Sequence, residues 1–275
     1  MRQRAISAAV LVPVLLIVLA LGGAVLSAAV ALITAVAAVE TFRLLKGAGY
    51  LPFAALGTAL AVVVVLDAAF PAVLEGSGLL LVAVGVVLVA VASLTRTEPI
   101  DGLQAWMATI FGALYVSLLS FIIRLGNAAP GVVEGSPLSA LGPERGWVLL
   151  LLLAVWSYDT GAFLVGRGLG RTRFLTHISP SKTVEGLVGG VIATTVVVAL
   201  VLVGLGHSPG HALALGPLAA LAAQAGDLAA SVLKRAAGAK DSGTLIPGHG
   251  GMLDRVDSFI FAAPIVTLYV LAFLG

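Results

Sequence analysis

The ionisable residues of this chain gather between Ser231 and Asp257, although only 10% of all residues are charged. Asp227 lies one helical turn before Ser231, and the stretch itself holds Lys234, Arg235, Lys240, Asp241, His249, Asp254, Arg255 and Asp257. Three glycines surround His249, and their bare backbone can turn its N–H groups on an anion. A loop that only orients membrane helices needs Lys and Arg alone. The mixed charges therefore predict a site for a metal-bound polyphosphate.

A second polar stretch runs from Gly166 to Gly186 and combines hydroxyl groups with a flexible ammonium group. The residues expected to contact a substrate are Ser179, Ser181, Lys182 and Thr183. Gly186, Gly189 and Gly190 follow at the start of an apolar segment. Small residues at this spacing predict close packing of two helices, above all at Gly186 and Gly190.

Two acids, Asp159 and Asp227, fall inside apolar segments long enough to cross a membrane. An ionisable group at the centre of such a helix costs about 2.5 to 3.5 kcal/mol, so these acids mark ion or substrate sites. Asp227, Ser231 and Lys234 recur at i, i+4 and i+7, and this shared helical face must line a polar cavity. For Asp159 a helix–helix hydrogen bond is the structural alternative.

Carboxylate oxygens are the ligands that hard divalent cations prefer. We therefore expect Mg²⁺ to be held by Asp227 and Asp254, with Asp257 and Asp241 in reserve, and a second cation is left open. Intramembrane acids also serve cation-coupled transporters, which are the alternative function. A transporter predicts matching interrupted spans in two halves, whereas the polar motifs here follow Asp159.

Composition points to an all-α polytopic integral membrane protein. The 275 residues are 60% hydrophobic and have a mean hydropathy of +1.14, and a soluble domain with this composition could not cover its surface. The absence of cysteine excludes disulfides and thiolate metal sites. The net charge of +2 is too small to indicate nucleic-acid binding.

About nine apolar segments are candidate spans, each able to cross or nearly cross a hydrocarbon core of about 30 Å. They lie near residues 5–21, 24–45, 54–74, 78–94, 104–123, 147–166, 187–206, 212–233 and 258–274. About five spans thus occupy residues 1–125, an irregular outer loop occupies 126–146, and about four spans form a catalytic region at 147–275. The first five spans are expected to be generic apolar helices, the first of them retained rather than cleaved as a signal.

An N-terminus in the cytoplasm places thirteen of the fifteen Lys and Arg residues on that side, leaving Arg124 and Arg145 outside. Both polar stretches then share the cytoplasmic face. The prediction is a multi-pass protein of the cell membrane, specifically a bacterial inner membrane. Its polar cavity is built from the C-terminal helices and opens to the cytoplasm.

The stretch from Ser231 to Asp257 resembles the signature of the phosphatidate cytidylyltransferases, also called CDP-diacylglycerol synthases. The matching positions, without gaps, are Ser231, Lys234, Arg235, Lys240, Asp241, Gly243, Ile246, Pro247, His249, Gly250, Gly251, Asp254, Arg255 and Asp257. The second stretch resembles the family's ISPxKTxEG element. Many members carry Glu where this chain has Ala230 and Ala236, which puts auxiliary carboxylates in doubt. The resemblance covers about the last 120 residues.

This resemblance implies an enzyme of phospholipid biosynthesis that transfers CMP from CTP to phosphatidic acid, giving CDP-diacylglycerol and pyrophosphate. The residues expected to act in catalysis are Asp227, Asp254, Lys234, Arg235 and His249, with Mg²⁺ on Asp227, Asp254 and Asp257. The residues expected to bind substrate are Asp159, Ser179, Ser181, Lys182, Thr183, Ser231, Lys240, Asp241, Gly250, Gly251 and Arg255. His249 can donate a hydrogen bond to a phosphate or brace its loop. Membrane lipids are the expected surroundings, and a homodimer is left open.

Overall fold

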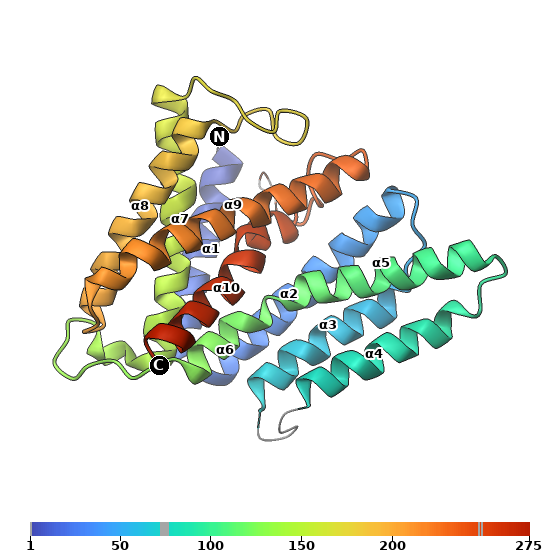
Figure 1. The fold of residues 1–275 in the computed structure, drawn as a ribbon, viewed down its shortest axis with the longest axis horizontal. Coiled ribbons are helices and arrows are strands. Elements are labelled where there is room, and N and C mark those ends of the chain that lie inside the picture. The colour runs from blue at the N-terminus through green and yellow to red at the C-terminus, as the bar shows by residue number, and fades with distance from the viewer. Residues whose placement is uncertain (1, 72–76, 247, 249) are drawn as a thin grey trace. The chain divides into compact units, whose positions relative to one another are not determined.

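The computed structural model describes residues 2–71, 77–246, 248 and 250–275, with side chains from residue 9 onward. This part of the chain is all-helical and contains no strand (Figure 1). Its α-helices are α1 (Arg2–Leu21), α2 (Gly23–Gly47), α3 (Ala54–Ala69), α4 (Gly78–Ser93), α5 (Pro99–Ser117), α6 (Ser120–Ala128), α7 (Gly142–Leu169), α8 (Val184–Gly204), α9 (Ala212–Ala236) and α10 (Leu253–Phe273). Two short 3₁₀ helices, η1 (Ser139–Leu141) and η2 (Pro209–His211), precede α7 and α9.

Each predicted span overlaps a helix, with α5 and α6 together forming the fifth segment. The predicted span 54–74 is longer than α3, which ends at Ala69, and its residues 72–74 lie outside the described residues. Among the described residues, six helical segments are long and apolar enough to cross a membrane: Gly23–Gly47, Pro99–Ala128, Ser139–Leu169, Val184–Gly204, Pro209–Ala236 and Leu253–Phe273. Three apolar helices, Ala9–Leu21, Ala54–Ala69 and Gly78–Ser93, are shorter. The all-α class is confirmed, and the chain is a multi-pass membrane protein.

The irregular connector before α7 is shorter than predicted. The expected loop at 126–146 begins with the last turn of α6 and ends inside α7, which starts at Gly142. Pro143 lies in the first turn of α7, where its missing N–H costs nothing and its fixed φ favours the helix. A proline counted as a loop residue therefore marks a helix start.

The chain forms two compact units that do not follow sequence order. The first unit comprises Met1–Ile123 and Val232–Val256, and the second comprises Arg124–Ser231 and Asp257–Gly275. The predicted division into 1–125, 126–146 and 147–275 was drawn along the sequence; apart from the bounds of the connector, it stays a prediction. In the first unit, the polar stretch after α9 belongs with the N-terminal helices.

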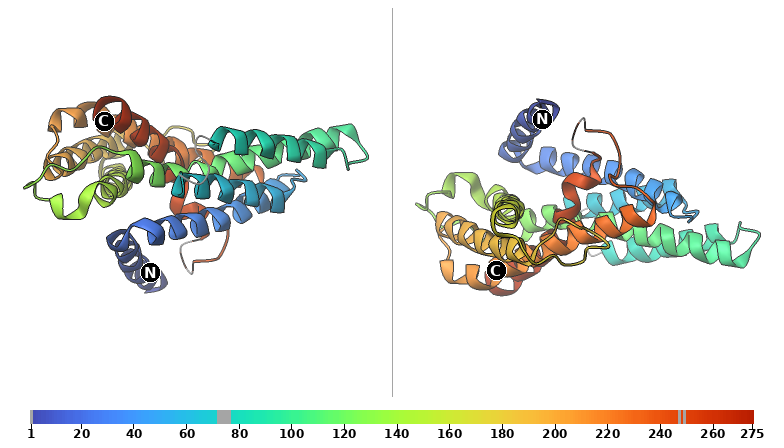
Figure 2. Two further views of the ribbon diagram at one scale, coloured as in Figure 1. Left: turned by 90° about the horizontal axis from the view of Figure 1, so that it is seen from below. Right: turned by 90° about the horizontal axis from the view of Figure 1, so that it is seen from above.

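Within the first unit, α2, α3, α4 and α5 lie side by side (Figures 1 and 2). Phe42 of α2 is 1% exposed and fills the space between two glycines. A Cβ atom at Gly57 of α3 would come within 2.2 Å of the Phe42 ring, and one at Gly112 of α5 within 2.6 Å. These glycines therefore let three helices close around one aromatic side chain.

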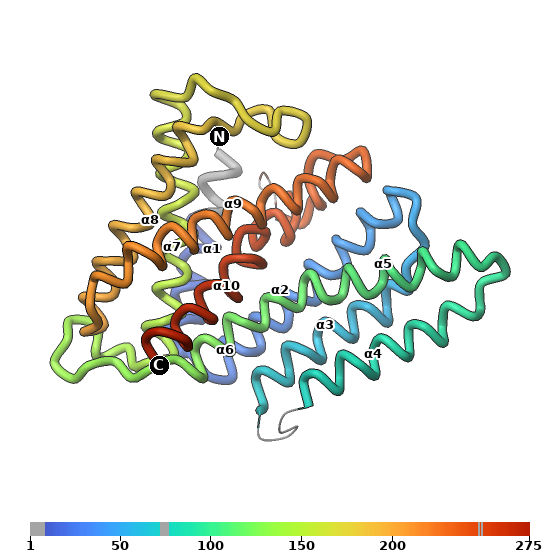
Figure 3. Tube along the Cα trace, in the orientation of Figure 1, coloured from blue at the N-terminus to red at the C-terminus, as the bar shows by residue number. Residues whose placement is uncertain are grey.

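Within the second unit, α7 and α8 pack along each other and are joined by the extended segment 170–183, visible as a long excursion of the tube (Figure 3). A Cβ atom at Gly186 would lie 2.9 Å from the Ala162 carbonyl oxygen, and one at Gly190 would lie 2.6 Å from the Tyr158 ring. The predicted small-residue packing face is confirmed.

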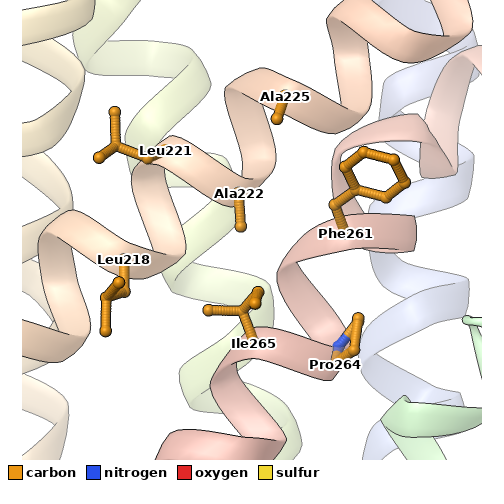
Figure 4. A pocket seen from close by; sticks show the side chains of 7 residues that line it. All are labelled: Leu218, Leu221, Ala222, Ala225, Phe261, Pro264 and Ile265. Carbon is orange, nitrogen blue, oxygen red and sulfur yellow. The ribbon is translucent and has the colours of Figure 1, made fainter.

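The parts of α9 and α10 that belong to the second unit also flank an apolar groove (Figure 4). Its lining residues are Leu218, Leu221, Ala222, Ala225, Phe261, Pro264 and Ile265. Every one of these side chains is apolar, so the groove supplies no group for phosphate chemistry.

Candidate active site

The segment between α7 and α8 is anchored at its base by Glu185. The Glu185 carboxylate accepts hydrogen bonds from the backbone N–H groups of Arg171 at 3.0 Å and Thr172 at 3.1 Å. Thr183 caps α8, because its hydroxyl oxygen accepts from the Gly186 N–H at 3.2 Å. Arg173 and Thr183 pair as an isolated β-bridge. These contacts hold the two ends of the loop together and fix the backbone next to Lys182.

Lys182 forms an ion pair with Asp227 of α9. The two side chains are 25% and 24% exposed, so solvent reaches both partners. Lys182 was predicted as a substrate contact and Asp227 as a metal ligand from separate motifs, and the second unit brings the two side chains together. A pair that solvent reaches can exchange its partner for a ligand.

The backbone next to Asp227 lies against α10. A Cβ atom at Gly226 would come within 2.3 Å of the Asp257 carbonyl oxygen, so only glycine permits this close crossing of α9 and α10. Asp257 is 9% exposed, and one of its carboxylate oxygens accepts from the Ser258 N–H at 2.8 Å. Two of the three predicted metal ligands thus lie on helices that cross at this point.

Tyr158 and Gln224 form a buried pair that sequence reasoning missed. The Tyr158 hydroxyl donates to the Gln224 side-chain oxygen. Tyr158 precedes Asp159, which is exposed on α7, and Gln224 lies three residues before Asp227. The pair joins α7 to the part of α9 that carries Asp227.

Lys234 and Asp254 form the second ion pair, in the first unit. The Lys234 Nζ atom lies 2.7 Å from Asp254 Oδ1, and the side chains are only 11% and 7% exposed. α9 ends two residues later, where Gly238 takes a φ of +66° and the Ala239 N–H returns to the Lys234 carbonyl oxygen. The chain then loops back to place Asp254 in the first turn of α10.

The other oxygen of Asp254 holds the loop between α9 and α10. Asp254 Oδ2 accepts from the Ser242 N–H at 2.8 Å and the Gly251 N–H at 3.0 Å, and the Ser242 hydroxyl lies at 2.9 Å. A carboxylate offers about four lone-pair sites. With Lys234 on Oδ1, donors occupy both oxygens of Asp254.

Glu40 of α2 is the residue that sequence reasoning missed most plainly. It is 3% exposed and accepts from the N–H groups of Met252 at 3.0 Å and Leu253 at 2.8 Å. The Ser242 hydroxyl lies 2.9 Å from Glu40 Oε2. Glu40 is the sole acid in the first 66 residues and falls inside a predicted span. The rule that intramembrane acids mark sites would have found it.

The remaining predicted residues divide by exposure. Ser181, Arg235, Lys240, Asp241 and Arg255 are exposed, Ser179 and Gly250 are half-buried, and Ser231 and Gly251 are buried. The Arg235 side chain donates to the Ala239 carbonyl oxygen of its own loop at 3.0 Å. His249 and Pro247 lie outside the described residues.

The acids differ in how well they suit a divalent cation. In the second unit, Asp227 pairs with Lys182 and is reached by solvent. Both features fit a ligand of a hard cation, because Lys182 can move away and leave the carboxylate to the ion. Asp254 does not fit in the observed arrangement, because the donors on both of its oxygens would have to leave first. Within each unit as described, no three His, Asp or Glu side chains form a metal-binding cluster.

Comparison with known proteins identifies the relatives of this chain. The model of the cytidylyltransferase family matches residues 2–273. A phosphatidate cytidylyltransferase of Synechocystis is 34% identical over 288 residues, spanning 99% of this chain and 97% of the relative. The chain belongs to the cytidylyltransferase family.

Two further relatives match over a shorter region. A phosphatidate cytidylyltransferase of Staphylococcus saprophyticus is 41% identical over 127 residues, 46% of this chain and 49% of its own length. The uncharacterized protein YnbB of Escherichia coli is 43% identical over 126 residues, 45% of this chain and 42% of its own. The resemblance seen in the signature residues is confirmed, and the family match extends it to the N-terminal helices.

Proposed function

We propose that this protein transfers CMP from CTP to phosphatidic acid. A phosphate oxygen of phosphatidic acid attacks the α-phosphorus of CTP, the bond from that phosphorus to the bridging oxygen breaks, and pyrophosphate leaves. The observation that carries the proposal is the match to the Synechocystis phosphatidate cytidylyltransferase over 99% of the chain. The Synechocystis and Staphylococcus relatives carry transferase names, and nothing favours the cation-coupled transporter.

The two ion pairs support distinct roles for their lysines. Each ammonium group faces a carboxylate in the observed arrangement, and a phosphate can take the place of that carboxylate. Lys182 is the more accessible phosphate ligand, and the hydroxyls of Ser179, Ser181 and Thr183 lie on the same loop. The attacking phosphate is already anionic near pH 7, so these residues have to shield charge rather than remove a proton.

Magnesium dependence is part of this proposal. Asp227 would hold the ion, with Asp257 on the neighbouring helix, and Mg²⁺ would neutralise charge on the triphosphate. Asp254 stays a predicted ligand that requires Lys234 to leave its Oδ1 atom. A second cation is a further hypothesis, and measuring turnover across Mg²⁺ concentrations with and without added monovalent salt tests it.

We further propose nine crossings, a cytoplasmic N-terminus and a polar cavity open to the cytoplasm of a bacterial inner membrane. The thirteen-to-two distribution of Lys and Arg supports this orientation. Single cysteines at the exposed positions Glu134 and Thr244, treated with an impermeant reagent on intact cells, test it. Labelling at 244 without labelling at 134 would reverse the orientation. The homodimer is a separate hypothesis, tested by cross-linking in detergent.

One assay tests the reaction itself. Purified protein is incubated with phosphatidic acid, CTP labelled at the α-phosphate and Mg²⁺, and the lipid phase is counted. A labelled lipid that co-migrates with CDP-diacylglycerol is the expected product. The matched reaction with γ-labelled CTP should leave the lipid phase unlabelled, because that phosphate departs in pyrophosphate. Label in the lipid from γ-labelled CTP would instead indicate a kinase.

A further inference from the structure

The carboxylate of Glu40 lies in the first unit, on a helix from the generic N-terminal spans, and it reaches the signature loop. Its oxygens accept from the N–H groups of Met252 and Leu253, which open α10. The first N–H groups of a helix have no partner within the helix. Glu40 therefore supplies from α2 the cap that α10 lacks in its own sequence.

Ser242 links this cap to the ion pair of Lys234 and Asp254. Its hydroxyl lies 2.9 Å from Glu40 Oε2 and 2.9 Å from Asp254 Oδ2. Its one proton serves one carboxylate at a time, while its backbone N–H donates to Asp254 at 2.8 Å. The carboxylates of Glu40 and Asp254 thus both hold the loop through Ser242.

Two signature glycines make room for Glu40. A Cβ atom at Gly251 would lie 2.4 Å from Glu40 Oε2, and one at Gly243 would lie 2.9 Å from Glu40 Oε1. At the end of α2, a Cβ atom at Gly47 would lie 3.3 Å from the Ala237 side chain. The close packing of α2 therefore explains why these three positions carry no side chain. A ligand that approaches the backbone is not needed to explain them.

A buried carboxylate is costly unless donors satisfy it. Glu40 is 3% exposed, and the donors described above are backbone N–H groups and a hydroxyl of the loop. Its hydrogen bonds therefore exist only when the loop takes the observed path. The start of α10 also favours an anion through the helix dipole.

We propose that Glu40 is a positioning residue, which holds Ser242, Met252 and Leu253 in the conformation that pairs Lys234 with Asp254. The link to turnover rests on the proposed transferase function, whereas the link to loop conformation does not. The role is indirect, because Glu40 acts through Ser242 and the backbone of α10.

Hydrogen exchange of the purified protein tests the conformational claim without any substrate. In Glu40→Gln one of the two acceptor oxygens becomes an NH₂ group, so one of the N–H groups of Met252 and Leu253 loses its acceptor, and its exchange should be at least about 10-fold faster. Thr41→Val is the matched control, since Thr41 is fully buried on the same helix and its hydroxyl finds no partner among the described residues. Unchanged exchange in Glu40→Gln overturns the proposal.

Turnover tests the link to catalysis. Loss of a charge-assisted hydrogen bond corresponds to about 10- to 150-fold, so kcat should fall by this range in Glu40→Gln. Glu40→Asp keeps the charge and should recover part of the loss, while Thr41→Val should match wild type. Faster exchange with wild-type kcat in Glu40→Gln overturns the catalytic link. If wild type makes no CDP-diacylglycerol, the proposed function fails while the exchange result stands.

Should Glu40→Gln fail to fold, Ser242→Ala replaces it. This change removes one donor and leaves both backbone N–H donors on Glu40. Exchange at Met252 and Leu253 should then rise by a smaller factor, about 3-fold. Unchanged exchange at both amides in Ser242→Ala would contradict the role of Ser242 as a link between the carboxylates of Glu40 and Asp254.

Discussion

One loop in each unit presents a lysine to an aspartate, and the two ion pairs differ in burial. Lys182 and Asp227 are about a quarter exposed, and Glu185 and Thr183 anchor the base of the loop that carries Lys182. Lys234 and Asp254 are mostly buried, and donors occupy both Asp254 oxygens. The same pairing is thus accessible in one loop and enclosed in the other.

This difference teaches what each pair can do. An exposed ion pair contributes about 0.2 to 1 kcal/mol and is readily exchanged. Breaking a buried pair by removing one partner costs about 3 to 5 kcal/mol, because a charge is left without compensation. We therefore expect the first pair to act mainly in ligand binding and the second mainly in holding structure.

The largest expected effect is that of Asp254→Asn. The change leaves Lys234 buried without a carboxylate and weakens the bonds to Ser242 and Gly251, so unfolding should become easier by about 3 to 5 kcal/mol. Thermal unfolding in detergent measures this, with turnover recorded in parallel. Asp241→Asn, an exposed acid of the same loop, is the stability control. If Asp254→Asn melts at the wild-type temperature, the Lys234–Asp254 pair is no more important for stability than the exposed Lys182–Asp227 pair.

Asp227→Asn should affect turnover far more than stability. Unfolding should change by less than about 1 kcal/mol, since the pair with Lys182 is partly exposed. Turnover should fall by roughly 100-fold or more if Asp227 holds the metal, because metal clamping is worth several kcal/mol. Glu134→Gln, an exposed acid in the connector before α7, is the control. Near-wild-type activity with an unchanged Mg²⁺ dependence would exclude Asp227 as an essential ligand.

Gly251→Ala tests how tightly the enclosed loop is packed. The new methyl group would lie 2.2 Å from the Ser242 hydroxyl oxygen and 2.4 Å from Glu40, so the free energy of unfolding should fall by about 1 to 3 kcal/mol. At Gly168 of α7 a methyl group meets nothing within 4 Å, and Gly168→Ala should be neutral or stabilising. Equal melting temperatures for the two variants would show that the loop around Gly251 rearranges to accommodate the methyl group at little cost.

The spans were predictable because a long apolar segment in a membrane satisfies its own backbone hydrogen bonds by forming a helix. The predicted segments at 24–45 and 187–206 match α2 and α8 closely. Helix ends were less predictable, as at Gly142, because a proline near a helix start looks like a loop residue. The assignment of Val232–Val256 to the N-terminal unit could not be predicted, since it depends on tertiary packing.

The site residues were predictable as a set but not as pairs. Spacing placed Lys234 and Asp254 in one signature, and nothing in the spacing said that they would bind each other. Glu40 was overlooked because its span has no motif, although a lone acid in an apolar helix is itself a signal. Pairing and burial arise between segments far apart in the chain, as for Glu40 and Ser242, which are 202 residues apart, and periodicity carries no such information.

The smallest expected effect is that of Lys240→Ala, in the exposed part of the otherwise enclosed loop. Lys240 is exposed, so its contribution to holding CTP phosphates is screened and should be worth roughly 1 kcal/mol, about a fivefold increase in the apparent KM for CTP. Arg235→Lys should instead weaken the use of phosphatidic acid, because the planar guanidinium suits a lipid phosphate better than an ammonium group does. Both KM values are measured in mixed micelles. If both variants change kcat alone, the contacts form only in the transition state and the two cations do not divide the substrates between them.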